Sequence, residues 1–223
     1  LPANVQNQLL DELAKVVDFE LGGHYINGEY EEGNDDTKLF DGILTRIVND
    51  DDVIKVTKAI SVIKKDDGTL EKKDVTGAID EANILAVLRA GKIKVPKPIR
   101  KHPNLKIFMS CEDFEIYDEV LTNKPFKGVD YTNMSSERYK GTQIVTLADW
   151  PKDVIVWAVT SSGIDSNFWA GVSFGEDEDV IQIDKLTNAG ERYFFKMQMK
   201  ADTNTVFGED IVLYDAREAD PEG

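Results

Sequence analysis

Few residues in this chain have the type and spacing that catalysis or metal binding requires. Its only imidazoles are His24 and His102, and neither has a second His, Cys or carboxylate at a recognised metal-ligand spacing. An isolated histidine carries little information about a site, because the same side chain often serves a structural contact or faces solvent. We therefore interpret both as structural or exposed residues in loops.

The single cysteine, Cys111, is expected in the first turn of a helix, where the helix dipole favours a thiolate. No motif supplies the general base that a nucleophile needs, so we interpret it as a structural cysteine packed beside a strand. The sequence also lacks a glycine-rich phosphate loop, a nucleophile elbow and an HExxH motif. We expect no catalytic, cofactor-binding or metal-binding residues, and no enzyme activity.

Charged residues form local clusters of both signs. The acidic run at 176–179 lacks the oxygen-ligand spacing of a calcium loop, so it is interpreted as a solvated turn, as is the segment 49–52. A basic segment is either a solvated loop that closes a helix or a surface that docks an acidic neighbour; it contains Lys92, Lys94, Lys97, Arg100, Lys101 and Lys106.

The overall charge limits the possible partners. The formal net charge is −16, from 42 acidic and 26 basic residues, and such a chain repels phosphate backbones. Sequence-specific nucleic-acid binding is therefore not expected. No apolar run approaches the roughly 20 residues that span a bilayer, so no membrane segment is expected either.

The first two thirds of the chain read as a mixture of helices and short strands. Apolar residues at a helical period predict a helix over 5–21 that stops at Gly22–Gly23, followed by an acidic loop over 28–42. β-Branched residues over 53–63 and the turn signal Asp67–Gly68 predict a hairpin.

Two further helices are predicted from capping signals. One begins at Thr76 and ends near Gly91, and Pro96 prevents its continuation. The other follows a strand over 105–109 and is capped by Ser110, with Asp113 completing a variant capping box.

The last third is nearly all β, with strands predicted at 144–147, 154–159, 180–183, 193–199 and 211–214. The predicted order has no repeated βαβ unit, which indicates an α+β fold.

The order of these segments resembles the tailed-bacteriophage major capsid protein family, whose fold is shared with encapsulins. The 5–21 helix and Gly22–Gly23 resemble the family's spine helix and glycine-rich loop, and 104–110 with the helix that follows resembles its central strand and helix. Three later segments resemble the family's next strands and its return to the peripheral domain, namely 141–145, 150–155 and 167–171.

The resemblance implies a tailed-phage capsid fold with a long spine helix, a mixed α/β axial domain and a β-rich peripheral domain. Residues 1–45 would form the first peripheral segment, 46–167 the axial domain and 168–223 the second peripheral segment with its long strands. The family places an N-terminal arm and an extended loop before the spine helix, and this sequence begins almost at that helix, so both are expected to be missing.

The function implied by the resemblance is that of a structural subunit of a bacteriophage or prophage capsid. Such a subunit self-assembles into pentamers and hexamers that enclose double-stranded DNA without sequence-specific binding, with a portal, a scaffold and a maturation protease as possible partners. It would be found in the virion capsid, and in the host bacterial cytoplasm during assembly.

Three alternatives remain open at this point. One is an encapsulin-like shell protein that encloses protein cargo. Another is a β-rich module that binds carbohydrate or peptide through its tryptophans, Trp150, Trp157 and Trp169. The third is an enzyme centred on Cys111 or an acidic pair.

Overall fold

The computed structural model describes residues 3–33, 38–65, 68–123, 137–173, 181–185, 193–197 and 200–217. The chain divides into two compact units. Unit 1 comprises Leu1–Ile43 and Trp169–Asn204, and unit 2 comprises Leu44–Phe168 and Thr205–Gly223. The segment predicted to run from 168 to 223 as one peripheral piece is therefore divided, because its last strand pairs within the sheet of unit 2.

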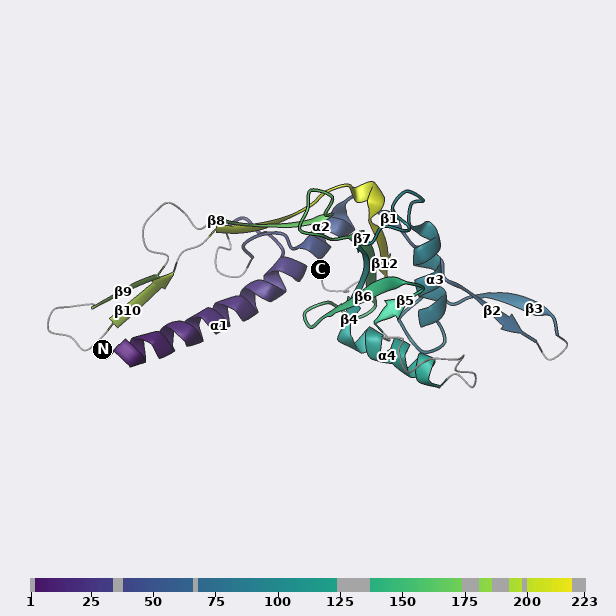
Figure 1. The fold of residues 1–223 in the computed structure, drawn as a ribbon, viewed down its shortest axis with the longest axis horizontal. Coiled ribbons are helices and arrows are strands. Elements are labelled where there is room, and N and C mark those ends of the chain that lie inside the picture. The colour runs from purple at the N-terminus through teal and green to yellow at the C-terminus, as the bar shows by residue number, and fades with distance from the viewer. Residues whose placement is uncertain are drawn as a thin grey trace. The chain divides into compact units, whose positions relative to one another are not determined.

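Unit 2 is built on a six-stranded mixed sheet (Figure 1). In spatial order the strands are β1 (Ile54–Lys55), β12 (Val212–Asp215), β7 (Val154–Val159), β4 (Leu105–Ser110), β6 (Thr142–Leu147) and β5 (Arg138–Tyr139). The β1–β12 and β4–β6 pairs are parallel, and the other three pairs are antiparallel. Strands β4, β6, β7 and β12 confirm the strands that the sequence predicted at 105–109, 144–147, 154–159 and 211–214.

Helices α3 (Ile84–Lys94) and α4 (Cys111–Thr122) contribute to the main apolar core of unit 2. On the central strand β4, Leu105, Ile107 and Met109 belong to this core, as the period-2 alternation of a strand requires. Phe108 points to the opposite face, where its ring lies 5.8 Å from Trp150 and 5.2 Å from Phe168. Both faces of the central strands are thus buried.

The two helices begin at different kinds of cap. At α4 the prediction is confirmed: the Ser110 hydroxyl accepts the Asp113 backbone N–H at 3.0 Å. At α3 it is wrong, because the helix begins after Asn83, which exchanges hydrogen bonds with Asp80. The Thr76 hydroxyl is committed elsewhere, since it accepts the Ala59 N–H at 2.8 Å.

Helix α3 also ends later than predicted. Gly91 lies inside the helix, which continues to Lys94, and a Cβ at position 91 would overlap the Trp157 ring. Gly91 is therefore present because the helix packs closely against β7, not because the helix ends there.

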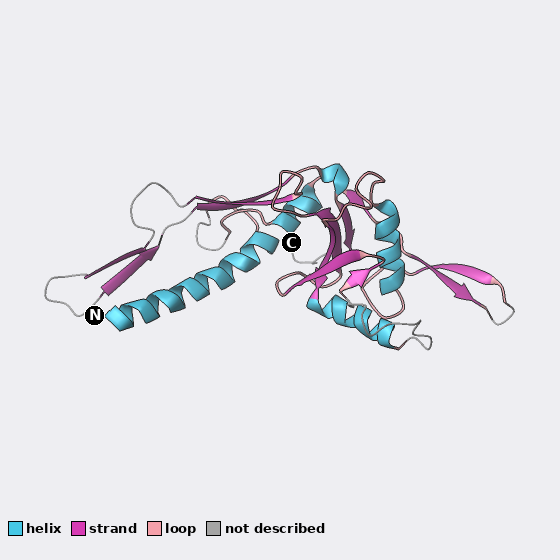
Figure 2. Ribbon diagram, viewed as in Figure 1, coloured by secondary structure: helices cyan, strands magenta, loops and turns pink. Residues whose placement is uncertain are grey.

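The predicted hairpin is formed by β2 (Ile60–Lys64) and β3 (Leu70–Asp74), which pair in antiparallel register and are joined by a turn in which Gly68 has φ +82°. Helix α2 (Ile43–Asn49) buries Leu44 and Ile47, and the short helix η1 (Gly208–Asp210) precedes β12. Figure 2 shows the helices and strands of unit 2 by colour. The mixture confirms the α+β class.

Unit 1 contains the long helix α1 (Ala3–Asn27) and short two-stranded sheets. The helix passes through Gly22–Gly23 without a break, so the predicted stop is wrong; a glycine in a helix costs about 1 kcal/mol but does not end it. The sheets pair β9 (Ile181–Lys185) with β10 (Tyr193–Met197) and β8 (Phe168–Ser173) with β11 (Lys200–Thr205). In the part of the chain that is described, no helix has the length and apolarity to cross a membrane.

Candidate functional site

The two histidines occupy different structural settings. His24 lies in α1, not in the predicted loop, and its ring packs edge-on against Phe40 at 6.1 Å. His102 lies in a turn, where Nδ1 accepts the Asn104 N–H at 3.2 Å and Nε2 lies 3.4 Å from Asp165 Oδ2. The described residues hold no group of three or more His, Cys, Asp or Glu side chains arranged to bind a metal ion.

Cys111 is the first residue of α4, as predicted, but its side chain is exposed. The expectation that it packs beside a strand is wrong, because the buried side of α4 is formed by Asp113 and Tyr117 instead. Its position makes Cys111 a surface residue of unit 2.

Only one of the two acidic segments lies within the described residues. The 176–179 run lies outside the described residues. In the 49–52 segment, the Asp52 backbone N–H donates to Asp50 Oδ1 at 2.9 Å, which is a local turn contact. This supports the interpretation of 49–52 as a solvated turn.

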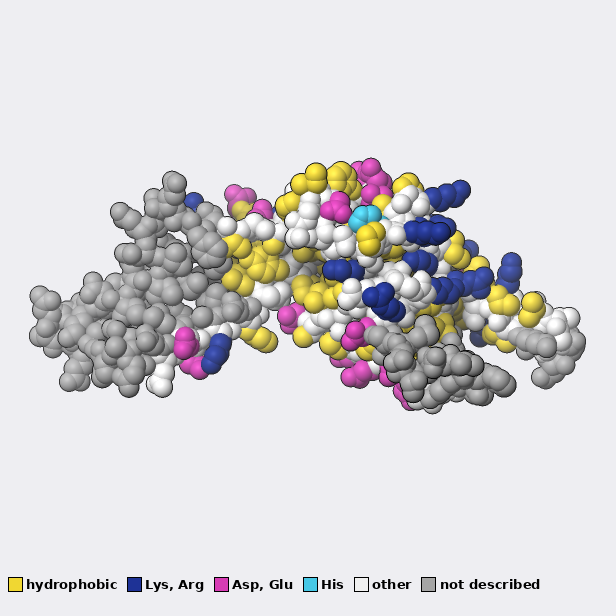
Figure 3. All heavy atoms as spheres, viewed as in Figure 1, with side chains coloured by type: hydrophobic (Ala, Val, Ile, Leu, Met, Phe, Trp, Pro, Cys, Tyr) yellow, Lys and Arg dark blue, Asp and Glu magenta, His cyan; other side chains and the backbone are white. Residues whose placement is uncertain are grey.

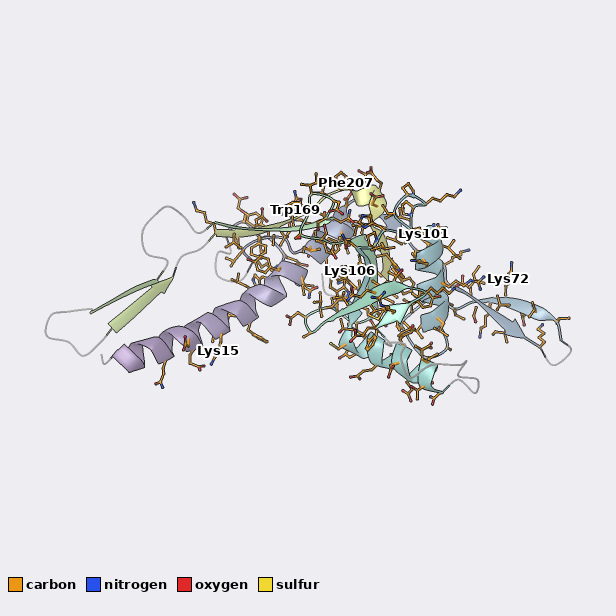
Figure 4. All side chains as sticks on the ribbon, viewed as in Figure 1. Lys15, Lys72, Lys101, Lys106, Trp169 and Phe207 are labelled. Atoms are coloured by element: carbon orange, nitrogen blue, oxygen red, sulfur yellow. The ribbon has the colours of Figure 1, made fainter. Side chains whose placement is uncertain are left out.

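The three tryptophans do not form a common surface. Trp150 and Trp157 are buried, and the Trp150 indole N–H donates to the Val154 carbonyl at 2.9 Å. Only Trp169 is exposed, at 42% (labelled in Figure 4). Two of the three rings that a tryptophan-based binding module would need are therefore buried and cannot contact a ligand.

The basic segment is partly used inside the protein. The Arg100 guanidinium donates to the carbonyls of Val95 and Ile93, both at 2.7 Å, and so satisfies acceptors at the end of α3. Lys92 donates to Thr142 Oγ1, and burial together with the nearby Arg100 charge lowers the pKa of Lys92. Lys94, Lys97 and Lys101 remain exposed.

A groove of about 290 Å³ lies between the β2–β3 hairpin and α3, and sequence analysis did not identify it. The hairpin contributes Ile60, Val62 and Lys72, three side chains on one face of the two strands, since Val62 and Lys72 are register partners. The other lining residues are Lys58, Ala86, Arg89, Ala90, Ile93 and Lys94. The groove thus has apolar walls and four basic side chains, and none of the described residues that line it is acidic.

This groove lies in the most basic region visible on unit 2. Figure 3 shows basic side chains gathered over α3 and the base of the hairpin, and Lys72 is labelled there in Figure 4. Three of the apolar side chains are unusually exposed: Ile60 at 44%, Val62 at 42% and Ile93 at 62%. Exposed apolar groups bordered by charge are typical of a surface that contacts another macromolecule.

A buried carboxyl group lies elsewhere in unit 2. Asp113 is fully buried, its Oδ2 accepts the Asp153 backbone N–H at 3.0 Å, and its Oδ1 has no hydrogen-bond partner. Burial raises the pKa of Asp113 to about 6. Asp153 in turn accepts the Ile79 backbone N–H through its side chain, so the two aspartates connect the start of α4 to two loops.

Comparison with known proteins identifies a fold and no closer relationship. No family model matches the chain, and no curated protein matches it. A chain in the solved satellite phage P4 procapsid, which includes the size determination (Sid) protein, has a similar fold with a TM-score of 0.60 and 12% sequence identity. The match covers 96% of this chain and 62% of that one.

At this identity the likeness establishes fold and not activity. Nearly the whole chain takes part in the match, so the similarity includes both units. The protein therefore has a fold related to that of a phage procapsid chain.

Proposed function

We propose that this chain is a structural subunit of an icosahedral bacteriophage or prophage capsid. The observation that carries the proposal is the fold similarity to a phage procapsid chain over 96% of the sequence. The exposed groove of unit 2 supports it, because shells are held together by repeated surface contacts between identical subunits. The subunit would self-assemble into pentamers and hexamers around double-stranded DNA.

The two units suit the two domains of such a subunit. Unit 2, with its mixed sheet and buried core, would be the axial domain, and unit 1 would be the peripheral domain with α1 as its spine helix. This assigns residues 205–223 to the axial domain, where the sequence alone placed them in the peripheral one.

The proposed role is mechanical and includes no catalysis, cofactor or bound metal. The side chains that sequence analysis considered for chemistry do not converge: His102 faces Asp165, and Cys111 is exposed on another element. A portal, a scaffold and a maturation protease are the partners that such a subunit would meet during assembly in the bacterial cytoplasm.

Electron microscopy of the assembled protein tests this function. Cells that express the chain are lysed, and sedimenting particles are purified and imaged. We expect closed shells, or rings with five-fold and six-fold symmetry. Nuclease-protected double-stranded DNA inside the shells would support a genome container, and protected protein without DNA would indicate an encapsulin-like shell. A chain that remains monomeric at all concentrations in the presence of its assembly partners would refute the proposal.

A further inference from the structure

The groove between the β2–β3 hairpin and α3 has a composition opposite to that of the chain as a whole. The chain carries 42 acidic and 26 basic residues, yet the described residues that line this groove include four basic residues and no acidic one. Its walls expose Ile60, Val62 and Ile93, which water solvates poorly. A binding partner for it would therefore combine negative charge with an apolar contact.

Helix α4 of the same protein has this combination. Glu112, Glu115 and Glu119 are exposed and fall on one side of the helix, at spacings of three, four and seven residues. Ile116 lies beside them; it packs against the core of unit 2 and keeps part of its surface exposed. None of the three glutamates forms an ion pair with a described residue, and Figure 3 shows acidic side chains along this helix.

The dimensions of the two surfaces also agree. Glu112 and Glu119 are separated by about 10 Å along the helix axis, and Arg89 and Lys94 on α3 by about 8 Å, at 1.5 Å per residue. A helix with an acidic face can therefore place two carboxylates over the two cations while Ile116 meets the apolar wall. This is the helix-in-groove mode of recognition.

We propose that the groove binds the acidic face of α4 from a second copy of this chain. No residue of α4 lines the groove, so the two surfaces are distinct parts of unit 2, and the contact between copies is head-to-tail. Head-to-tail contacts generate closed rings when the rotation between copies closes. The inference rests on the proposed shell function and names the contact that builds its rings.

Nucleic acid would also meet the basic side chains, but it fits the groove less well. A phosphate backbone gains little from the apolar side chains that form most of the wall. The groove is also short, since α3 has only 11 residues. The acidic helix accounts for both the charge and the apolar contact.

Cross-linking through the native cysteine tests the proposal on the intact chain. Cys111 is the only cysteine, is exposed, and begins α4 next to Glu112, so it can carry a benzophenone maleimide at the edge of the acidic face. After illumination over a concentration series, we expect cross-linked pairs whose attachment peptides contain residues 58–72 or 86–94. Pairs attached elsewhere, or no pairs at all, would overturn the proposal.

Charge reversal on each surface provides a second test. We expect the variant R89E/K94E and the variant E115K/E119K each to lose roughly tenfold in cross-linked pairs, because like charges then face each other. Mixing the two variants should restore the yield, since an acidic groove then meets a basic α4. A mixture that stays at the level of either variant alone would contradict the proposed pairing.

A matched control separates local contact from overall charge. The variant K97E/K101E changes the net charge by the same amount as R89E/K94E, at exposed lysines that do not line the groove. Its cross-linking yield should equal that of the wild type. An equal loss in both variants would show that only net charge matters and would overturn the proposal.

Three additional outcomes distinguish the related ideas. Duplex DNA that binds the wild type and K97E/K101E but not R89E/K94E, as measured by fluorescence anisotropy, would assign the groove to nucleic acid and overturn the copy-to-copy contact. Shells in electron micrographs whose cross-links avoid the groove would refute this contact and leave the shell function standing. Absence of both shells and cross-linked pairs would refute the two together.

Discussion

The two units of the protein bury their side chains to different extents. Unit 2 holds nearly all of the buried apolar residues that are described, including Trp157, Leu88 and Tyr214, each at most 1% exposed. In unit 1, the described apolar residues of α1 include Phe19, which is 76% exposed, and Val16, which is 52% exposed. Among the residues whose burial is described, unit 2 thus has a packed core, whereas Val16 and Phe19 of α1 in unit 1 are exposed.

This difference fits a subunit whose second unit folds by itself and whose first unit gains contacts from neighbours. Isolated helices depend on packing for most of their stability. In a shell, that packing would come from other copies. The following predictions test whether the contrast between the units holds.

A large effect is expected from one added methyl group. Gly91→Ala should destabilise the protein by about 3 kcal/mol, because the new Cβ overlaps the Trp157 ring and forces α3 away from the sheet. Gly23→Ala in α1 is the matched control, because no atom lies within 4 Å of a Cβ built there. Ala is the better helix former by about 1 kcal/mol, so this variant should be neutral or slightly more stable. Urea unfolding of both variants measures the contrast, and equal effects would contradict it.

The buried carboxyl group of unit 2 should make stability depend on pH. The pKa of Asp113 is about 6 in the folded protein and near 3.9 in the unfolded chain, so the folded state binds the proton more tightly. The free energy of unfolding should therefore fall by about 1 kcal/mol from pH 5 to pH 7 through this group. In Asp113→Asn this contribution is lost. Unfolding curves at both pH values compare the two proteins, and identical pH dependence in both would refute the role of Asp113.

Changing the exposed aromatic residue of α1 should have a smaller effect on stability. Phe19→Ser is expected to change the free energy of unfolding by no more than about 0.5 kcal/mol, because the ring is mostly in water already. Leu88→Ala, in the core of unit 2, should cost about 2–4 kcal/mol. Thermal melts of the two variants give the comparison. A large loss in Phe19→Ser would mean that this ring is packed within the monomer.

The smallest expected effect is at the exposed cysteine. Cys111→Ser should leave the unfolding free energy and the oligomeric state unchanged within about 0.5 kcal/mol, because the thiol is exposed and has no chemical role in the proposed function. Thermal melts and light scattering measure both properties. Rapid labelling of Cys111 by a mechanism-based electrophile that requires the folded protein would instead point to a reactive thiol.

Sequence patterns predicted the elements that local chemistry determines. The strand β7 was found at its full length, since the six residues from Val154 to Val159 are all apolar and all buried. The cap of α4 was predicted because Ser110 and Asp113 have the spacing that an N-cap requires. These signals lie within a few residues of the structure they specify.

Features that depend on tertiary contacts were missed. Gly91 looked like a helix end, and only the packing of Trp157 against it explains why the helix continues. Strand β11 was missed because Lys200–Thr205 is mostly polar and lacks an apolar alternation. The groove could not be found either, because α3 and the hairpin are separated in sequence; the placement of Ile60 and Val62 on either side of Ser61 was its only local signal.

The most direct test of the proposed shell function is where the protein is found and how abundant it is there. Particles that protect double-stranded DNA from nuclease are purified by density from the bacterial cells that carry the gene, and their proteins are quantified by mass spectrometry. We predict that this chain, or a longer protein that contains it, is the most abundant protein in those particles, because a shell requires many identical subunits. Its absence from the particles, or its presence in fewer copies than the other particle proteins, would contradict the account.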